Sequence, residues 1–356
     1  MEKKAVITGI GVLGDCGIGK ENFHRFFSGP ISVINPSEID FDAYIDTALV
    51  RRADHVSRCA LMAVTLALKD ANFTISKRIN HRIGVVLSTM HGALHHTVEY
   101  HTSLALNDPK LVSPLLFGES GAIAAVSHIS TTFGIRGYTT TTSGYCSAIQ
   151  ALQIGVELIQ YGALDACLVG GADVNHDFLT KAYKRCLKNP QLIAKSFGGS
   201  GFVLLESLPC ALQRKTKIYA QIEGVSVITA AHIKAKRYSI SPLNELLYKN
   251  RSKPKYDCLL NASFAEKDSL LRRDLFLRAF KGIKFDCSDN FGYGFSAAEA
   301  FQIILGALGV SSLEPASFFK ASKVLKGHIG RLFIMRTALA GANACALLSH
   351  YPLDKD

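Results

Sequence analysis

The stretch "TTTTSGYCSAIQALQIGVELIQYGALDACLVGGADV", residues 139–174, contains the pattern that decides the fold. A polar run ends at Gly144, a turn follows, and an amphipathic helix then leads into an apolar strand that closes on two glycines. A turn in this position presents one side chain at the N-terminus of the helix. Tyr145 and Cys146 are the two candidates, and they differ greatly in reactivity.

The same alternation of strands and helices continues on either side of this stretch. Apolar patterns predict strands at 4–14, 82–89, 199–207, 218–228 and 255–263, and a glycine turn followed by a strand within 337–351. They predict helices at 57–73, 113–134 and 296–310. Strands that are apolar on both faces indicate sheets covered by helices on both sides, hence an α/β fold. The pattern begins again after residue 210, so we expect two halves, 1–210 and 211–356.

Length and charge limit the possible functions without fixing one. The 356 residues exceed what one hydrophobic core usually holds, and 48% of them are apolar, as in a compact α/β protein. The net charge of +11 fits simple solubility, and it also fits attraction to an acidic protein or to nucleic acid. The basic residues are densest at 234–239 and 249–255, where no nucleic-acid motif accompanies them. We therefore expect no nucleic-acid partner.

The nine cysteines are dispersed and contain no CxxC pair, which favours reduced thiols in the cytoplasm over a disulfide framework. The apolar run near the N-terminus is too short and too rich in glycine for a signal peptide, and no segment predicts a membrane span. A GxG at 9–11 lacks the third glycine and the acidic residue of a dinucleotide site. We expect no cofactor, no metal site and no membrane contact.

In this order, the segments resemble the β-ketoacyl synthases of the thiolase superfamily over nearly the whole chain. The similar runs are "VITGIGVLGDCGIGKENFHRFFSGP", "RIGVVLSTMHG", "VSPLLFGESGAIAAVSHISTTFGIRG", "LIQYGALDACLVGGADV" and "GANACALL". The resemblance implies the thiolase fold, a duplicated αβαβα architecture of five layers in which each half supplies one sheet. It also implies a dimer.

Active members of this family need a cysteine at a helix N-terminus and two histidines. The helix lowers the pKa of the thiol that attacks an acyl thioester, and the histidines assist decarboxylation and stabilise negative charge. The family presents them in segments resembling T-A-C-A-S, N-A-H-G-T and G-H-T-x-G-A-A-G. Whether this chain resembles an active member therefore depends on which residues it has at the cysteine and the two histidine positions of these segments.

The resemblance places other residues at all three catalytic positions. Matching the helix without gaps puts Tyr145 at the nucleophile, whereas a shift of one residue would put Cys146 there and disturb the helix match. In "LLNASFAEKD", Ser263 stands where the first histidine belongs. In "DNFGYGFSAAEA", Gly292 matches and Tyr293 replaces the second histidine. A phenol with a pKa near 10 is a poor nucleophile at neutral pH, so the resemblance implies an inactive subunit.

An inactive chain of this type resembles a chain length factor of a bacterial type II polyketide synthase. The resemblance implies a heterodimer with an active ketosynthase, an acyl carrier protein as a further partner, and a role in closing the partner's acyl tunnel. In the family the segment 113–128 packs at the dimer interface, where Gly118, Gly121 and Ala125 would share one helical face and line a deep tunnel. These small residues would equally allow close helix packing without any tunnel.

Two departures from the family bear on this interpretation. Chain length factors often carry glutamine at the lost cysteine, whereas this chain has tyrosine or cysteine there. The segment after Asp173 also reaches "SFGGSGFVLLE" without the usual R-D-G-F. An active β-ketoacyl synthase that condenses carrier-protein thioesters through Cys146 remains the alternative, and a scaffolding protein with this fold is a further one.

Overall fold

The computed structural model describes residues 3–28, 39–46, 51–186, 198–229, 257–263, 282–287, 295–312, 328–337 and 342–351. The α-helices in these ranges are α1 (Gly19–Ser28), α2 (His55–Asp70), α3 (Leu94–Leu106), α4 (Pro114–Glu119), α5 (Ala124–Phe133), α6 (Ser147–Gln160), α7 (Asp177–Cys186), α9 (Leu208–Arg214) and α13 (Phe295–Ser311). The strands are β1 (Ala5–Gly14), β2 (Gly17–Ile18), β3 (Ile83–Ser88), β4 (Thr139–Thr142), β5 (Ala166–Asp173), β6 (Gly199–Ser207), β7 (Ala220–Thr229), β8 (Asp257–Ser263), β9 (Ile283–Asp286), β10 (Arg331–Thr337) and β11 (Ala342–Ser349).

The strands form two sets of five that are joined in the middle. The hydrogen-bonded order is β4-β3-β5-β6-β1-β7-β11-β10-β8-β9, with β2 paired to β1. The two sets meet where β1 pairs with β7 through three residue pairs, from Ala5 with Ile222 to Ile7 with Ala220. Each set therefore has one free edge among the described residues, β4 in the first and β9 in the second.

The two sets repeat the same topology. Read from its edge, each set has its third, second, fourth, fifth and first strand in chain order. The first three strands from the edge are parallel in both sets, and the last two pairings are antiparallel. The helices α6 and α13 occupy equivalent places, each between the third and fourth strands of its set. The division at residue 210 that the sequence predicts falls within α9, which in chain order follows the last strand of the first set and precedes the first strand of the second. This division stays a prediction.

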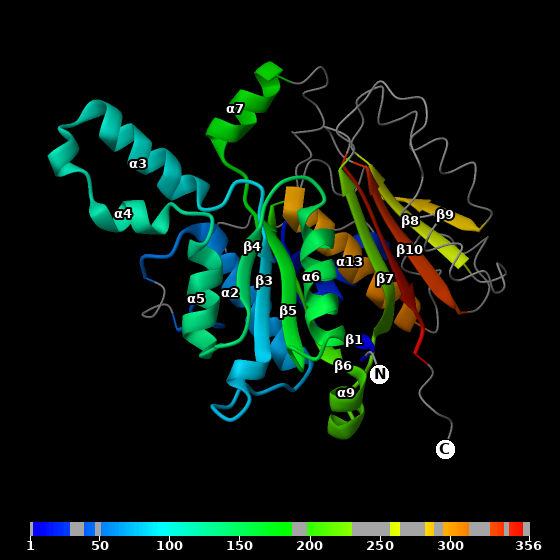
Figure 1. Cartoon of the computed structure of the whole chain (residues 1–356). Coiled ribbons are helices and arrows are strands. Elements are labelled where there is room, and N and C mark those ends of the chain that lie inside the picture. The colour runs from blue at the N-terminus through cyan, green and yellow to red at the C-terminus, as the bar shows by residue number, and fades with distance from the viewer. Residues whose placement is uncertain are drawn as a thin grey trace.

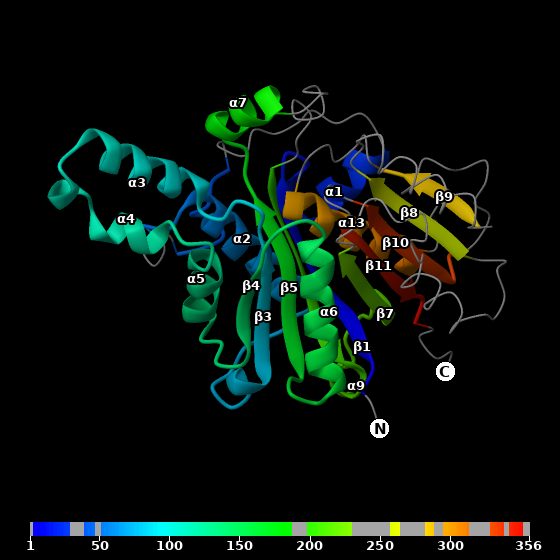
Figure 2. The same cartoon turned by 45° about the horizontal axis from the view of Figure 1, so that its top comes forward.

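The helices form layers around these strands (Figures 1 and 2). The outer face of the first set is covered by α2 and α5, while α6 and α13 lie between the two sets and contact strands of both. One apolar core surrounds the central helices, and a second lies under α2 and α5. All ten residues of β1 and all eight of β5 are buried, as expected for strands covered on both faces.

Most of the elements predicted from the sequence are confirmed with shifts of a few residues at their ends. The strands predicted at 4–14 and 199–207 are β1 and β6, and the helices predicted at 57–73 and 296–310 are α2 and α13. Within the described residues no helix combines the length and the apolar character that a membrane crossing requires.

The single helix predicted across 113–134 is wrong, because the chain forms the two helices α4 and α5 there. Ser120 ends α4, with its amide donating to the carbonyl groups of Leu116 and Phe117, and the Thr97 hydroxyl donates to the Ser120 carbonyl. Across the break, His128 of α5 lies 2.7 Å from the carboxylate of Glu119. The small residues around 118–122 do not hold a continuous helix against these contacts.

Candidate functional site

The candidate site lies where α6 and α13 begin. Because β3, β4 and β5 are parallel, the turn that leads from β4 into α6 lies beside the carboxyl ends of β3 and β5. The start of α13 reaches the same edge, since a Cβ atom at Gly171 of β5 would lie only 2.2 Å from the Ser296 carbonyl oxygen. A glycine at position 171 therefore allows the two halves to approach each other at this point.

Tyr145 and Cys146 both lie on the turn in front of α6. Cys146 is the N-cap residue, with φ 61° and ψ 19° in the left-handed region, and α6 begins at Ser147. Tyr145 is partly buried and packs against the central apolar core. Cys146 is thus the residue at the N-cap of α6, and Tyr145 comes directly before it.

The environment of Cys146 opposes reactivity. The residue is fully buried, and its sulfur lies 3.9 Å from the carbonyl oxygen of Arg336. Burial raises the pKa of the Cys146 thiol well above its ordinary value, and the carboxylate of Glu299 adds to that rise. A thiolate, which is the form that attacks a thioester, is therefore disfavoured at this position.

Glu299 of α13 binds the first amides of α6 with both carboxylate oxygens. Its Oε1 accepts from the Cys146 amide at 2.9 Å, and its Oε2 accepts from the Ala148 amide at 2.8 Å. The Arg336 Nε lies 3.2 Å from Oε1, and both charged side chains are almost completely buried. Burial raises the pKa of the Glu299 carboxyl, while Arg336 and the two amide donors oppose the rise.

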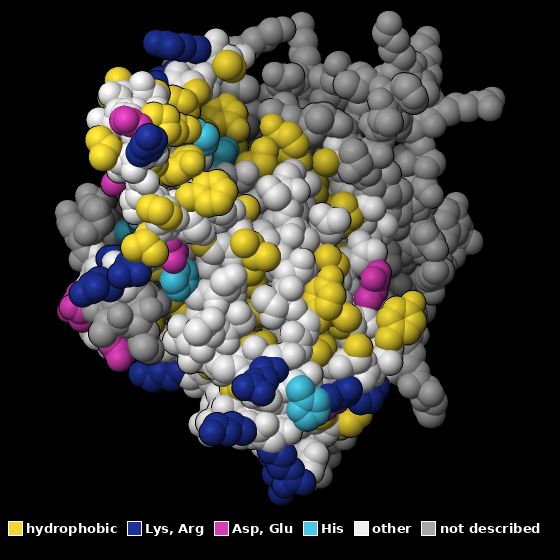
Figure 3. All heavy atoms as spheres, turned by 60° about the vertical axis from the view of Figure 1, so that its left-hand side comes forward, with side chains coloured by type: hydrophobic (Ala, Val, Ile, Leu, Met, Phe, Trp, Pro, Cys, Tyr) yellow, Lys and Arg dark blue, Asp and Glu magenta, His cyan; other side chains and the backbone are white. Residues whose placement is uncertain are grey.

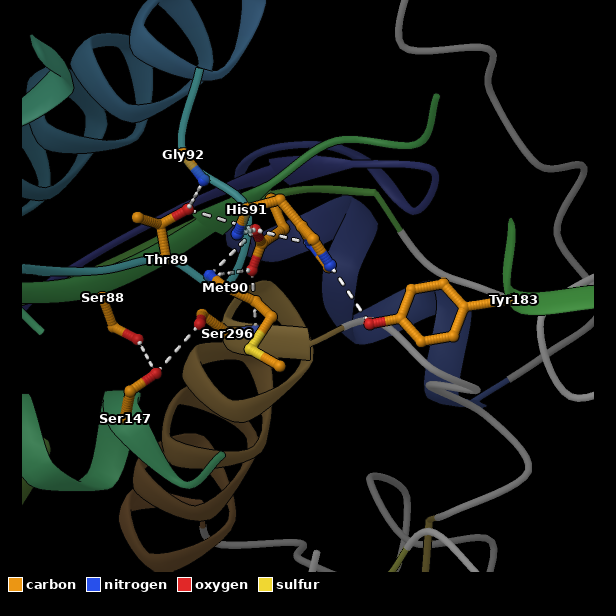
Figure 4. A network of polar contacts seen from close by, with 9 residues as sticks. Ser88, Thr89, Met90, His91, Gly92, Ser147, Tyr183 and Ser296 are labelled. Carbon is orange, nitrogen blue, oxygen red and sulfur yellow. Dashed lines mark hydrogen bonds and ion pairs between the residues drawn. The ribbon is translucent and has the colours of Figure 1, made fainter. Parts of the chain in front are cut away.

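A second buried carboxylate connects the two halves at the same edge (Figure 4). Asp173, at the end of β5, accepts from the amides of Met90 at 3.0 Å, His91 at 3.1 Å and Ser296 at 2.9 Å. The Thr89 hydroxyl donates to the same carboxylate. Asp173 therefore fixes the segment after β3 and the start of α13 relative to β5.

Three serines continue this network toward α6 (Figure 4). The Ser147 hydroxyl lies 2.7 Å from that of Ser88 and 3.1 Å from that of Ser296. On the other side, the His91 ring packs edge-on against Phe295 and its Nε2 lies 3.3 Å from the Tyr183 hydroxyl. His91 thus contacts α7 and α13, while the Cys146 sulfur points to the backbone of Arg336.

Of the other two predicted catalytic positions, the structure describes the backbone of Ser263 but not Tyr293. The backbone of Ser263 lies at the end of β8 in register with Thr337, next to Arg336 of the neighbouring strand, so it lies at the same edge as the start of α6. Tyr293 lies outside the described residues, two positions before α13 begins. The assignment of Tyr145, Ser263 and Tyr293 as vestigial catalytic positions stays a prediction.

The three residues predicted to line a tunnel do not share one helical face. Gly118 is exposed on α4, Gly121 lies partly buried in the turn, and Ala125 is buried in the core under α5. The reason is the break between α4 and α5, which removes the helical spacing on which the prediction relied. Their role as lining residues remains a prediction for each residue separately.

Sequence reasoning missed Glu299 and Arg336, although one signal was present. With Gly292 on the first glycine of the family segment G-H-T-x-G-A-A-G, Glu299 stands on the last glycine. An acidic residue in the otherwise apolar α13 needs a partner when it is buried. Nothing local indicates that the partner is Arg336, which lies on β10.

The described residues contain no group of three or more His, Cys, Asp or Glu side chains that could hold a metal ion. The polar groups of the site are instead joined to one another and to backbone amides. Their arrangement binds the two halves of the chain together and opposes ionisation of the thiol at the start of α6.

Comparisons with known proteins agree with the resemblance read from the sequence. Residues 24–204 match the family model described as the N-terminal domain of β-ketoacyl synthase. A Streptomyces halstedii homologue named polyketide β-ketoacyl synthase 1 is 27% identical over 273 residues, which cover 65% of each chain. The 3-oxoacyl-[acyl-carrier-protein] synthase 1 of Haemophilus influenzae is 26% identical over 62% of this chain and 63% of that protein. The chain thus matches less than two thirds of the length of these curated relatives.

Solved structures extend the similarity to the whole chain. The ishigamide ketosynthase/chain length factor matches with a TM-score of 0.79 at 19% identity, over 99% of this chain and 100% of that one. A type II polyketide synthase acyl-carrier protein in complex with its ketosynthase matches with a TM-score of 0.76 at 17% identity, over 99% and 100%. These matches confirm the predicted fold class, the α/β thiolase fold with its duplicated five-layered αβαβα architecture.

The burial of Cys146 predicts that its thiol resists alkylation in the folded chain. Reaction would need local opening, and an opening free energy of about 2.7 kcal/mol would slow it about a hundredfold. Iodoacetamide should therefore modify the exposed Cys186 at least about a hundredfold faster than Cys146. Peptide mass spectrometry gives both rates, and denaturation in guanidinium should make them similar. Equal rates in the folded chain would contradict the buried thiol.

Proposed function

The chain belongs to the β-ketoacyl synthase family, and on this premise we propose that it is a chain length factor. In this role it is a non-catalytic subunit that pairs with an active ketosynthase and shapes the acyl tunnel that sets the length of a polyketide. The observation that carries the proposal is the start of α6, where Glu299 binds the first amides and Cys146 is buried without a stabilised thiolate. Both features remove what acyl transfer needs at a helix N-terminus.

The alternative, an active synthase that uses Cys146, would need a different arrangement at the same place. The thiol would have to reach the surface of a cavity, and the negative charge beside it would have to leave. It would also need a donor to stabilise the oxyanion that forms on the thioester carbonyl, whereas Glu299 already accepts from the amides of Cys146 and Ala148. The geometry therefore favours the non-catalytic role.

A surface for the partner is offered by the projecting pair of helices α3 and α4 (Figures 1 and 3). Six of the eleven exposed large apolar side chains of the described residues lie in residues 94–123, a segment called the arm from here on: Leu104, Leu106, Leu111, Leu115, Phe117 and Ile123. An apolar concentration of this kind is typical of a protein interface. The strand β4, which contacts α5, is the free edge of the first set among the described residues and can also pair with another chain.

The carrier protein is the second proposed partner. One structural neighbour is an acyl-carrier protein in complex with its ketosynthase, and the net charge of +11 on this chain would favour an acidic protein of that kind. The cytoplasmic location predicted from the dispersed cysteines fits this role. Gly118, Gly121 and Ala125 are retained as proposed positions at the tunnel; an added Cβ atom would meet no atom within 4 Å at Gly118 and none closer than 3.9 Å at Gly121.

Co-expression with an active ketosynthase encoded beside this chain tests the pairing. We expect a one-to-one complex, and Phe117→Asp should weaken it at least about tenfold, since a charge replaces an exposed apolar side chain at the interface. Leu212→Asp, which changes another exposed apolar residue on α9 away from the arm, is the matched control. Absence of a complex, or equal affinity for both variants, would contradict the proposed partner surface.

Gly121→Phe tests the tunnel in the reconstituted complex. A Cβ atom at Gly121 would meet its nearest neighbours at 3.9 Å, an ordinary contact distance, so position 121 can accept a side chain. It would fill space beside the partner, and overfilling an apolar cavity costs about 1–3 kcal/mol, enough to end elongation earlier. Mass spectrometry of the products should show a shorter polyketide. Glu157→Phe, on the exposed surface of α6, should leave the length unchanged; the same products from Gly121→Phe would exclude Gly121 from the tunnel.

A further inference from the structure

The N-terminus of α6 is already occupied by a charged group of the chain itself. The carboxylate of Glu299 receives the amide hydrogens of Cys146 and Ala148 at 2.9 and 2.8 Å. These are among the amides that an α-helix leaves without partners inside the helix. Because Glu299 comes from α13, the contact spans the boundary between the two halves of the chain.

A free helix N-terminus would attract a different anion. Its unpaired amides and the helix dipole stabilise a negative charge, such as a cysteine thiolate or the oxyanion of an attacked thioester. In this chain the carboxyl group of Glu299 occupies that position and accepts from two of these donors. A thiol placed beside it would meet repulsion where a catalytic thiol needs stabilisation.

Arg336 holds the carboxylate in place. Its Nε lies 3.2 Å from Glu299 Oε1, and the side chains of both residues are at most 3% exposed. A buried carboxylate without a cation or hydrogen-bond donors would be expelled or protonated, whereas this one has both. The contact is therefore a stable part of the fold and not a side chain that happens to rest there.

We propose that Glu299, held by Arg336, is an internal lock that fills the anion position at the start of α6 and keeps the chain inactive. This inference rests on the proposed non-catalytic role and says which contact maintains it. It implies that placing a thiol at position 145, the nucleophile position of the family match, is not sufficient to create a nucleophile. The carboxylate must be removed as well.

The test compares thiols placed at position 145 with and without the lock. In Tyr145→Cys, the rate of alkylation by iodoacetamide is followed from pH 6 to pH 10; the thiolate sulfur displaces iodide and forms the new C–S bond. With Glu299 present, the thiol should titrate at or above about 8.5, the ordinary value. Adding Glu299→Gln should lower the titration midpoint by at least about one unit and speed alkylation at pH 7 about tenfold.

Two further variants keep the comparison decisive. Glu206→Gln is the matched control, because Glu206 is also fully buried and lies 3.0 Å from an arginine, Arg214, but away from α6. This control substitution should leave the alkylation rate of the thiol introduced by Tyr145→Cys unchanged. If Glu299→Gln alone fails to fold because Arg336 loses its partner, Glu299→Gln with Arg336→Met removes both charges. Folding is checked by circular dichroism and urea unfolding.

Equal titration midpoints with and without Glu299 in folded variants would overturn the inference, whether both thiols react slowly or both react fast. A faster thiol in the Glu206→Gln control would overturn it too, since the effect would then be general loosening. Alkylation at position 145 reports only the state of the α6 N-terminus. Such a result would leave open whether the chain pairs with a ketosynthase, which the co-expression experiment decides independently.

Discussion

The carboxylate of Glu299 lies between the two halves of the chain, accepting from the first amides of α6 and pairing with Arg336 of β10. This one contact sets the electrostatics of the candidate site. It neutralises the positive end of α6, it adds a negative charge beside the only thiol on the turn, and it joins α6, α13 and β10 into one buried unit. The N-terminus of α6 thus binds a carboxylate from the second half of the chain, as the positive end of a helix dipole favours.

The duplicated topology explains why these groups meet. Because both sets of strands have the same order, α6 and α13 enter the space between them from equivalent positions. Gly171 lets β5 approach the first residues of α13, and Asp173 then accepts from the Ser296 amide of α13 and from the Met90 and His91 amides after β3. The result is an edge at which buried polar groups of both halves contact one another.

The sequence was sufficient for the elements whose signal is local. Buried strands such as β1 show as apolar runs ended by glycines, and α13 shows as a long apolar helix, so both could be placed within a few residues. The break between α4 and α5 could not be placed, because Gly118, Ser120 and Gly121 fit a helix or a turn, and contacts with distant residues decide between them. The turn before α6 was predicted, but the burial of Cys146 depends on the second half.

The contact of Glu299 with the start of α6 and with Arg336 could not be predicted from the sequence and is seen only in the three-dimensional structure. Glu299 and the amide of Cys146 are 153 positions apart, so their meeting follows from how the halves pack and not from any motif. The family resemblance could place Tyr145, Ser263 and Tyr293 over catalytic positions, and it could not reveal that Glu299 binds the start of α6. An acidic residue inside an apolar helix is the only sequence signal, and it indicates a buried partner without naming one.

The most direct test of the non-catalytic role uses the assembled pair. A complex is reconstituted from this chain, the carrier protein and a ketosynthase whose own nucleophilic cysteine is replaced by alanine, and condensation of malonyl units is followed by mass spectrometry. The account predicts that no elongated acyl chain forms, because this subunit provides no working nucleophile. Elongated products from that complex would contradict it and would place the chemistry on this chain.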